Sequence, residues 1–199
     1  MKRSPILKHL IENEESEGHN LISIVELFKR RIYQYCRGEE KIYSEFKKDI
    51  ASFKDGGNDA IAIVKVNEQK SITFFAHSTI DEKNENTWAK NQDTIEIAFL
   101  PPVEERKFEK YIFKTTPNRD INSGDIPRIH DTEYKLLENI ASYLKFESSV
   151  KGEIKVYTTL QPCFSCDSVF LEFNRCFPEV RIDVFYKKEY NVRKRKELF

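Results

Sequence analysis

The chain has 199 residues, which is enough for one sizeable domain, alone or with an appendage. Its 33 lysine and arginine residues equal its 33 aspartate and glutamate residues, and this net charge of zero argues against a protein that coats nucleic acid electrostatically, although it allows a local basic groove. No run approaches the ~18 apolar residues that a membrane-spanning helix needs, and residues 1–5 are not followed by the apolar core of a signal peptide.

Residues 1–55 carry apolar residues at helical spacing and are expected to form an N-terminal helical extension. A short stripe spans residues 6–11, and a stronger one follows Asn20, which is placed as a helix cap. A further helix is expected to end near Gly56. The stronger stripe consists of Leu21, Ile24, Val25, Phe28 and Ile32. We expect these helices to pack against the remaining domain, and the alternative is a cap that contacts substrate or a partner.

The main domain is expected over residues 56–199 and begins with two β-rich runs. Residues 60–66 and 71–77 flank a polar stretch at 67–70, which is typical of a hairpin. His77 ends the second run, near the point where a substrate pocket would open. It is either a surface histidine at a strand end or a residue that contacts a base or sugar.

An insertion is expected over residues 78–128, where it could form a wall of the site. Within it, residues 94–100 alternate like a strand, residues 108–115 fit a strand or a short helix, and residues 118–127 have the composition of a loop. Its aromatic residues are either core residues or platforms on which a base could stack. They are Trp88, Phe108, Tyr111 and Phe113.

A helix is expected to begin shortly after Pro127, because apolar residues follow at helical spacing. Its first turn carries Asp131 and Glu133, and His130 lies one position before Asp131. Neighbouring helix positions point about 100° apart, so His130 and Asp131 cannot exchange roles unless the helix start moves. This helix start therefore offers one metal ligand and one carboxylate.

A strand at 153–157 leads into residues 162–166, which have the sequence P-C-F-S-C and open the next helix. Two intervening residues bring the sulfurs of Cys163 and Cys166 to one side of the first turn, where unpaired N–H groups favour thiolates. Such a pair is half of a site for a thiophilic metal, and zinc fits best. A last strand is expected at 180–186, before a basic tail that would attract phosphate if it lay beside the site.

Helix, strand and helix with Asp131-x-Glu133 and Pro162-Cys163-x-x-Cys166 resemble the zinc deaminases of nucleosides and nucleobases, whose signature is H-x-E…P-C-x-x-C. The usual histidine falls on Asp131 here, and in this the chain resembles the bacterial toxin-type deaminases of the cytidine deaminase-like superfamily. The resemblance implies an α/β, three-layer fold with a mixed central sheet of about five strands flanked by helices.

The same resemblance implies a zinc cofactor and names its site. Asp131, Cys163 and Cys166 would hold the metal, with His130 as the alternative ligand, and Glu133 would carry protons beside it. A carboxylate oxygen is an acceptable zinc ligand, so aspartate in place of histidine is compatible with the site. The residues expected to contact substrate are His77, Thr159, Pro162 and Ser165.

The expected function is hydrolytic deamination of a nucleobase, with cytosine in nucleic acid preferred over a free nucleoside or nucleotide and over adenine. Two hypotheses come from other classes: a zinc-stabilised binding domain without activity, and a C-x-x-C redox protein arranged like thioredoxin. The toxin-type resemblance adds an immunity protein as a candidate partner, whereas no membrane partner is expected. We expect the protein in the cytoplasm, either its own or that of a cell into which it is delivered.

Overall fold

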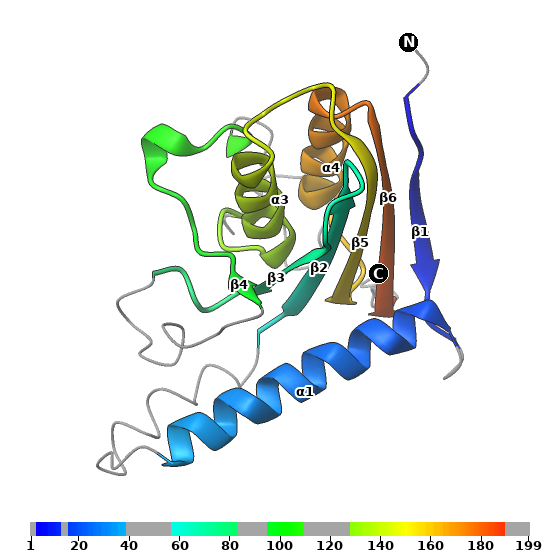
Figure 1. Ribbon diagram of the computed structural model, residues 1–199. Helices are drawn as coiled ribbons and strands as arrows, with labels where there is room; N and C mark the ends of the chain where they lie inside the picture. Colours follow the sequence, from blue (N-terminus) through cyan, green and yellow to red (C-terminus); the bar gives the residue numbers. More distant parts are fainter. Residues whose placement is uncertain (1–2, 13–15, 39–56, 83–94, 110–127, 190–199) are drawn as a thin grey trace, which may run out of the picture.

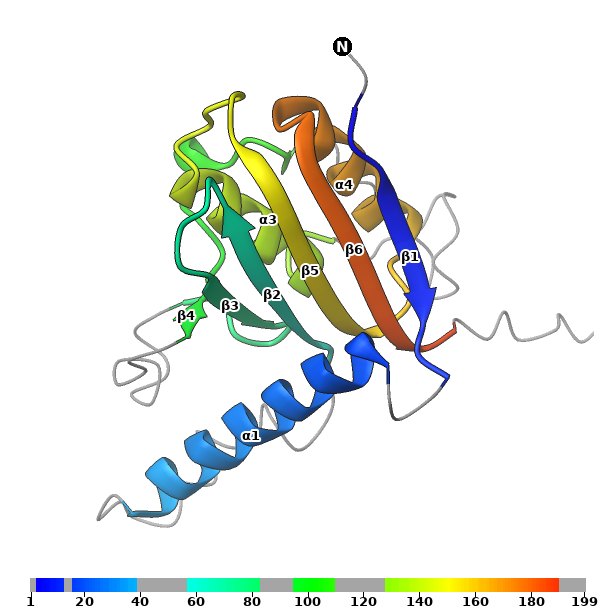
Figure 2. The same ribbon diagram turned by 45° about the vertical axis from the view of Figure 1, so that its right-hand side comes forward.

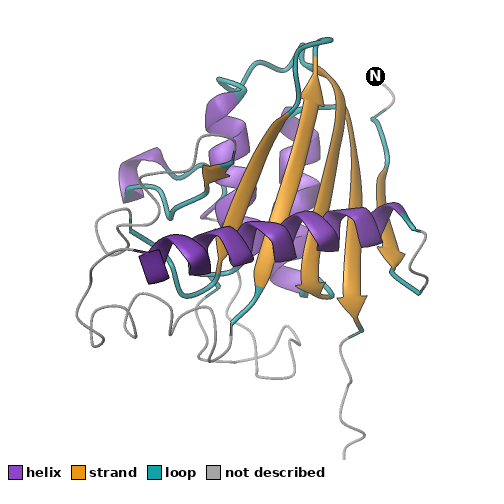
Figure 3. Ribbon diagram, turned by 60° about the horizontal axis from the view of Figure 1, so that its bottom comes forward, coloured by secondary structure: helices purple, strands orange, loops and turns teal. Residues whose placement is uncertain are grey.

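The computed structural model describes residues 3–12, 16–38, 57–82, 95–109 and 128–189. The strands of this part are β1 (Ile6–Leu10), β2 (Asp59–Val66), β3 (Ile72–His77), β4 (Glu96–Ile97), β5 (Lys151–Leu160) and β6 (Glu179–Lys188). They form one mixed sheet in the order β1-β6-β5-β2-β3-β4. Helices α3 (Thr132–Tyr143) and α4 (Phe164–Cys176) cover one face, and α1 (Glu17–Gly38) crosses the other (Figures 1 and 3). The expected three-layer α/β fold is confirmed.

The predicted hairpin joins β2 and β3, which pair antiparallel. Its turn places Asn67 and Glu68 in the left-handed region, with φ values of 49° and 59°. Two consecutive residues with positive φ match the turn type whose twist fits two antiparallel strands. On the other side β2 pairs antiparallel with β5, and β5 pairs parallel with β6 through the crossover helix α4.

Alternation along the strands divides the core into two layers. Ala60, Ala62 and Val64 of β2 are buried on the face covered by α3 and α4. Ile61, the residue between the first two, belongs to the other layer, where it packs with Phe28 and other apolar residues of α1. The stripe predicted on α1 is therefore the packing face of that helix, since Leu21, Val25, Phe28 and Ile32 are all buried there.

The N-terminal segment differs from the prediction. Residues 6–10, expected as a helical stripe, form the edge strand β1 beside β6, to which it is parallel (Figure 2). The reason is long-range: the outer edge of β6 offers backbone hydrogen bonds that a short amphipathic helix could not use. The α1 helix begins before Asn20, and Ser16 Oγ accepts the His19 N–H at 3.2 Å, so Ser16 takes the role expected of Asn20. The helix expected before Gly56 lies outside the described residues.

The sheet has six strands among the described residues rather than about five, because β1, at a position expected to be helical, adds a strand at one edge. Of the predicted strand at 94–100, only Glu96–Ile97 forms β4, parallel to β3. Phe108 is 1% exposed and belongs to the core, as the core alternative for this residue requires. Trp88, Tyr111, Phe113 and residues 118–127 lie outside the described part. No described helix is both long and apolar enough to cross a bilayer.

Candidate metal centre and active site

Two helix N-termini meet at one end of the sheet. Asp131 is the N-cap residue of α3 and Cys163 is the N-cap residue of α4. An aspartate at an N-cap usually accepts a hydrogen bond from the first turn of its own helix. The Asp131 side chain makes no such bond, and its carboxylate is directed toward the cysteines of α4. Asp131 therefore stands at a capping position, but its carboxylate faces the cysteines of α4 and does not cap α3.

The three predicted ligands lie together. Asp131 Oδ2 is 3.5 Å from Cys163 Sγ and 3.3 Å from Cys166 Sγ, and the two sulfurs are 3.3 Å apart. Both cysteines are buried, and Asp131 is half-buried. Arg128 Nη1 is 3.5 Å from the other carboxylate oxygen, Oδ1. One oxygen and two sulfurs therefore form a compact set of donor atoms beside a guanidinium.

This donor set fits zinc. Ligand atoms around a tetrahedral zinc ion lie about 3.5–3.8 Å apart, given the usual zinc–oxygen and zinc–sulfur distances. The separations between Asp131, Cys163 and Cys166 are close to these values. Two thiolates with a carboxylate also suit a borderline-soft cation. Among the residues that the structure describes, these three form the group able to hold a metal ion.

The two thiols are not equivalent. A hydrogen bond from the Cys166 side chain lowers the pKa of Cys163, against the effect of burial. The pKa of Cys166 is raised, first by its hydrogen bond with Cys163 and then by its complete burial. Cys163 is therefore the sulfur that ionises first, and it would offer the first thiolate to an incoming metal.

Glu133 stands beside this group and is only 3% exposed. Its Oε1 accepts a hydrogen bond from Thr158 Oγ1 at 2.8 Å, and its Oε2 accepts one from Thr132 Oγ1 at 3.0 Å. Oε2 also lies 3.7 Å from Cys166 Sγ. The carboxylate is thus held in one orientation, with one oxygen facing the sulfurs.

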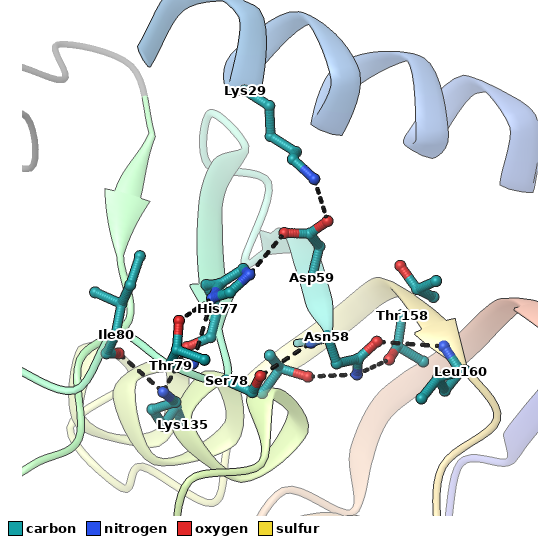
Figure 4. A network of polar contacts seen from close by, with 12 residues as sticks. Lys29, Asn58, Asp59, His77, Ser78, Thr79, Ile80, Lys135, Thr158 and Leu160 are labelled. Atoms are coloured by element: carbon teal, nitrogen blue, oxygen red, sulfur yellow. Dashed lines mark hydrogen bonds and ion pairs between the residues drawn. The ribbon is translucent and has the colours of Figure 1, made fainter. Parts of the chain in front are cut away.

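Asn58 completes the hydrogen-bonding around Glu133, and the sequence analysis did not identify it. Its side-chain Nδ2 donates to Thr132 Oγ1 at 2.8 Å. It also donates to Thr158 Oγ1 at 2.8 Å (Figure 4). An asparagine after two glycines is a common turn composition, so its local sequence predicts a turn. Only the approach of β2, α3 and β5 to one another brings this amide into the site.

His77 is placed inside the protein and not at its surface. The residue is 3% exposed, and its Nδ1 accepts from the Thr79 N–H at 3.2 Å. Its Nε2 lies 3.7 Å from Asp59 Oδ1, and Lys29 of α1 reaches the other oxygen of Asp59 at 2.7 Å (Figure 4). Burial lowers the pKa of His77 to about 4 despite the nearby Asp59, so the ring is neutral at pH 7.

Lys135 fastens the end of β3 to α3. Its side chain is 0% exposed, and its Nζ donates to the carbonyls of His77 and Ile80 at 2.6 and 2.8 Å. Its third contact is Asp81 Oδ1, at 2.9 Å. The other oxygen of Asp81 lies 2.7 Å from His130 Nδ1. His130 therefore contacts Asp81 and is not in the group formed by the aspartate and the cysteines.

The remaining predicted contacts lie around the junction of β5 and α4: Thr159 is in β5, Pro162 is in the connecting loop and Ser165 is in the first turn of α4. Pro162 and Ser165 are buried, whereas Thr159 is half-buried and lies 3.5 Å from Tyr157 Oη. Phe164, between the two cysteines, is 55% exposed. Next to this loop, Gln161 N–H donates to the Lys188 carbonyl at 3.0 Å, which brings the start of the basic C-terminal segment beside it.

Comparison with known proteins identifies one family. A family model described as toxin-deaminase, the BURPS668_1122 family of deaminases, matches residues 34–188, well over half of the chain. No curated protein and no solved structure gives a significant match.

Proposed function

The chain belongs to this toxin-deaminase family, and from that premise we propose that it is a zinc-dependent hydrolase that removes an amino group from a nucleobase. The observation that carries the proposal is the meeting of Asp131, Cys163 and Cys166 beside Glu133, whose Oε2 is 3.7 Å from the Cys166 sulfur. A metal-binding triad with an adjacent carboxylate that is not one of the ligands is the arrangement that hydrolytic deamination requires.

In this proposal Asp131, Cys163 and Cys166 hold zinc, which supplies a nucleophilic water at neutral pH when it is bound. Glu133 would accept one proton from the attacking water as the oxygen bonds to the ring carbon bearing the amine, and it would pass this proton to the ring nitrogen. Glu133 would then take the second proton of that water, from the hydroxyl now on the ring carbon, and deliver it to the amine, which leaves as ammonia as its bond to the carbon breaks. For cytosine the balance is cytosine plus water giving uracil plus ammonia.

Asp131 is the proposed ligand in preference to His130. The Asp131 carboxylate approaches both sulfurs, whereas the His130 ring makes its contact with Asp81 at 2.7 Å. Carboxylate oxygen is an established zinc donor, so the replacement of the usual histidine is chemically acceptable.

The proposed substrate is cytosine in nucleic acid. Two features support a polymer: Phe164 is exposed beside the metal-binding cysteines, where a base could stack, and Lys188 lies next to the same loop. Thr159, Pro162 and Ser165 would line the base pocket. The burial of His77 favours support of the pocket from behind over direct contact with the base. Free nucleotides and adenine are the alternative substrates.

The two alternatives from other classes are weaker. A redox protein would use the cysteines alone and would leave the hydrogen-bonded Glu133 without a role. A zinc-stabilised binding domain would likewise need no buried carboxylate at 3.7 Å from a ligand sulfur. As a member of a toxin family the protein would also have an immunity protein as partner, and metal binding by the thiols of Cys163 and Cys166 would suit a reducing compartment such as the cytoplasm.

The test is zinc content followed by product release. Purified wild-type protein is expected to contain about one zinc ion, lost in Asp131→Ala and Cys163→Ala but kept in His130→Ala. The zinc-loaded protein is then incubated with single-stranded DNA and RNA and with free nucleosides, and uracil and hypoxanthine products are quantified. Absence of zinc together with ready formation of a Cys163–Cys166 disulfide would overturn the proposal in favour of redox chemistry.

A further inference from the structure

We infer that Asn58 is a positioning residue for Glu133: its amide fixes the direction of two threonine hydroxyls, which in turn hold the Glu133 carboxylate against the metal-binding cysteines. The four side chains form a closed ring that runs from Asn58 through Thr132 to Glu133 and back through Thr158. The catalytic meaning of this ring rests on the proposed function, whereas its hydrogen-bond directions follow from the structure alone.

The orientation of the Asn58 amide is determined by the backbone. The Leu160 N–H, which can only donate, points at Asn58 Oδ1 at 3.3 Å. The Nδ2 group must therefore occupy the other side, where the two threonine hydroxyls lie. The main chain of Asn58 is fixed as well: its N–H donates to Ser78 Oγ at 2.9 Å, and its carbonyl accepts the Ser78 N–H at 3.0 Å (Figure 4).

The orientation of the Asn58 amide then determines the direction in which the hydroxyls of Thr132 and Thr158 donate. Each threonine hydroxyl has one hydrogen, and each oxygen already accepts a hydrogen bond from Asn58 Nδ2 at 2.8 Å. The hydrogens of Thr132 and Thr158 must consequently point at Glu133, and they reach different oxygens of its carboxylate, at 3.0 and 2.8 Å. The neutral Asn58 amide thus determines that both threonine hydroxyls donate to the Glu133 carboxylate.

All four residues of the ring are largely buried, which makes an unsatisfied hydrogen bond among them costly. Thr132 and Thr158 are 0% exposed, Glu133 is 3% exposed and Asn58 is 9% exposed. Water has little access to replace a lost partner of a buried polar atom here. A substitution that exchanges a donor for an acceptor therefore leaves an unsatisfied group, at the full cost in folding free energy. Hydrogen bonds in such a chain also polarise one another, which couples the ends of the ring. Asn58 and Glu133 are therefore linked through the two threonine hydroxyls.

The ring also explains how the sheet sets the site. Asn58 directly precedes β2, Thr132 begins α3 and Thr158 lies in β5. These segments are far apart in sequence and meet only through the fold. Glu133 consequently takes its orientation from the two central strands and not from α3 alone, which keeps Oε2 toward Cys166.

A double-mutant cycle tests the coupling. Asn58→Asp replaces the donor by an acceptor, so the hydroxyls face two carboxylates and cannot satisfy both. Glu133→Gln returns a donor to the opposite side of the ring and lets one hydroxyl turn toward residue 58. Thermal unfolding of the zinc-loaded full chain is expected to show a smaller effect of Asn58→Asp in the Glu133→Gln background. Midpoint shifts should differ by about 2–4 °C between the two backgrounds.

The matched control is Asn139→Asp. Asn139 is also an amide that donates twice, to the carbonyls of Phe99 and Lys135 at 2.7 and 2.8 Å, but it is not part of the ring. Its substitution should lower the midpoint equally in both backgrounds. Equal shifts for Asn58→Asp in the two backgrounds would overturn the inference, even if the wild type deaminates. A coupled pair in a protein without deaminase activity would instead reject the proposed function and keep the ring.

A second pair of variants covers the case in which Asn58→Asp does not fold. Thr158→Val removes the hydroxyl at nearly constant shape, and Thr158→Ser retains it. On a substrate that the wild type deaminates, we expect the valine variant to lose at least about 100-fold in kcat with zinc retained, and the serine variant to stay within about tenfold of wild type. Equal losses in the two variants would contradict a positioning role for the hydroxyl.

Discussion

Arg128 Nη1 lies 3.5 Å from Asp131 Oδ1, while the other oxygen of the same carboxylate, Oδ2, is the one that contacts the cysteine sulfurs. The Arg128 side chain is only 12% exposed, so this pair is partly shielded from water. A carboxylate with two thiolates carries one more negative charge than the usual histidine with two thiolates. In the proposed zinc site the guanidinium would balance the negative charge that the aspartate adds, and it would orient the carboxylate so that Oδ2 faces the sulfurs.

Loss of this arginine should weaken zinc binding. For Arg128→Gln we expect an affinity about 10–100-fold below wild type, because a partner that orients a metal ligand has been removed. Competition with a chromophoric chelator measures the change. Arg175→Gln is the matched control, since its guanidinium pairs with Glu172 on the surface of α4. Equal affinities for wild type and Arg128→Gln would show that Asp131 needs no such support.

Glu133→Gln should separate binding from turnover. The variant is expected to keep the zinc content of wild type and to lose about 10²–10⁴-fold in turnover, because glutamine has the shape of glutamate but cannot carry the proton. Zinc analysis and product release on the same preparation give both quantities. Glu147→Gln, on the exposed side beyond α3, is the control and should change neither. Loss of zinc in Glu133→Gln would instead identify Glu133 as a ligand.

His77 should make the protein sensitive to acid. Its pKa is about 4 in the folded protein, because of burial, against 6.5 when it is exposed. Between pH 6.5 and pH 4 the unfolded chain binds this proton more readily than the folded chain does. The part of the unfolding free energy that depends on a neutral His77 is therefore complete above pH 6.5 and is lost as the pH falls toward 4. The loss should approach about 3 kcal/mol.

Urea unfolding between pH 7 and pH 4 measures this dependence. His77→Gln should flatten the pH profile over that window, whereas His19→Gln on α1 should leave the wild-type slope in place. The same slope in wild type and His77→Gln would mean that other groups cause the acid sensitivity.

Lys135→Met should destabilise the fold strongly. The substitution leaves the carbonyls of His77 and Ile80 without their buried donor and removes the ion pair with Asp81. We expect a loss of about 3 kcal/mol in unfolding free energy, measured with urea. Lys70→Met, in the exposed hairpin turn, should change it by less than about 0.5 kcal/mol. A similar small effect at Lys135 would contradict its role in fastening β3 to α3.

The end of β6 should contribute to binding if the substrate is a polymer. Leu160 pairs with Lys188 in the sheet, so exposed Lys187 and Lys188 adjoin the loop that leads from β5 to the cysteines at the start of α4. Reversal of both charges to glutamate should weaken binding of single-stranded nucleic acid, and the difference should shrink as salt rises. Fluorescence anisotropy at several salt concentrations measures it. Lys65→Glu with Lys70→Glu, near the hairpin at the far end of β2, is the control.

Several features follow from the sequence because their causes are local. Two β-rich runs separated by a short polar turn predict the β2–β3 hairpin. Apolar residues at helical spacing predict the packing face of α1. The prediction of a helix at residues 6–10 is wrong, because the structure of this segment depends on a distant part of the chain. Its apolar spacing also fits a helix, and its strand conformation depends on pairing with β6, more than 170 residues away.

The sequence by itself determined the chemical groups of the site: a carboxylate pair at one helix start and a cysteine pair at another, whose spacings are set by local helix geometry. Only the tertiary structure decided how those groups are held. Asn58 has a common turn composition, Lys135 has the charge of a surface residue, and His130 adjoins the ligand position. Their partners come from other segments of the chain, and such long-range hydrogen bonds leave no periodic pattern in the sequence that could have predicted them.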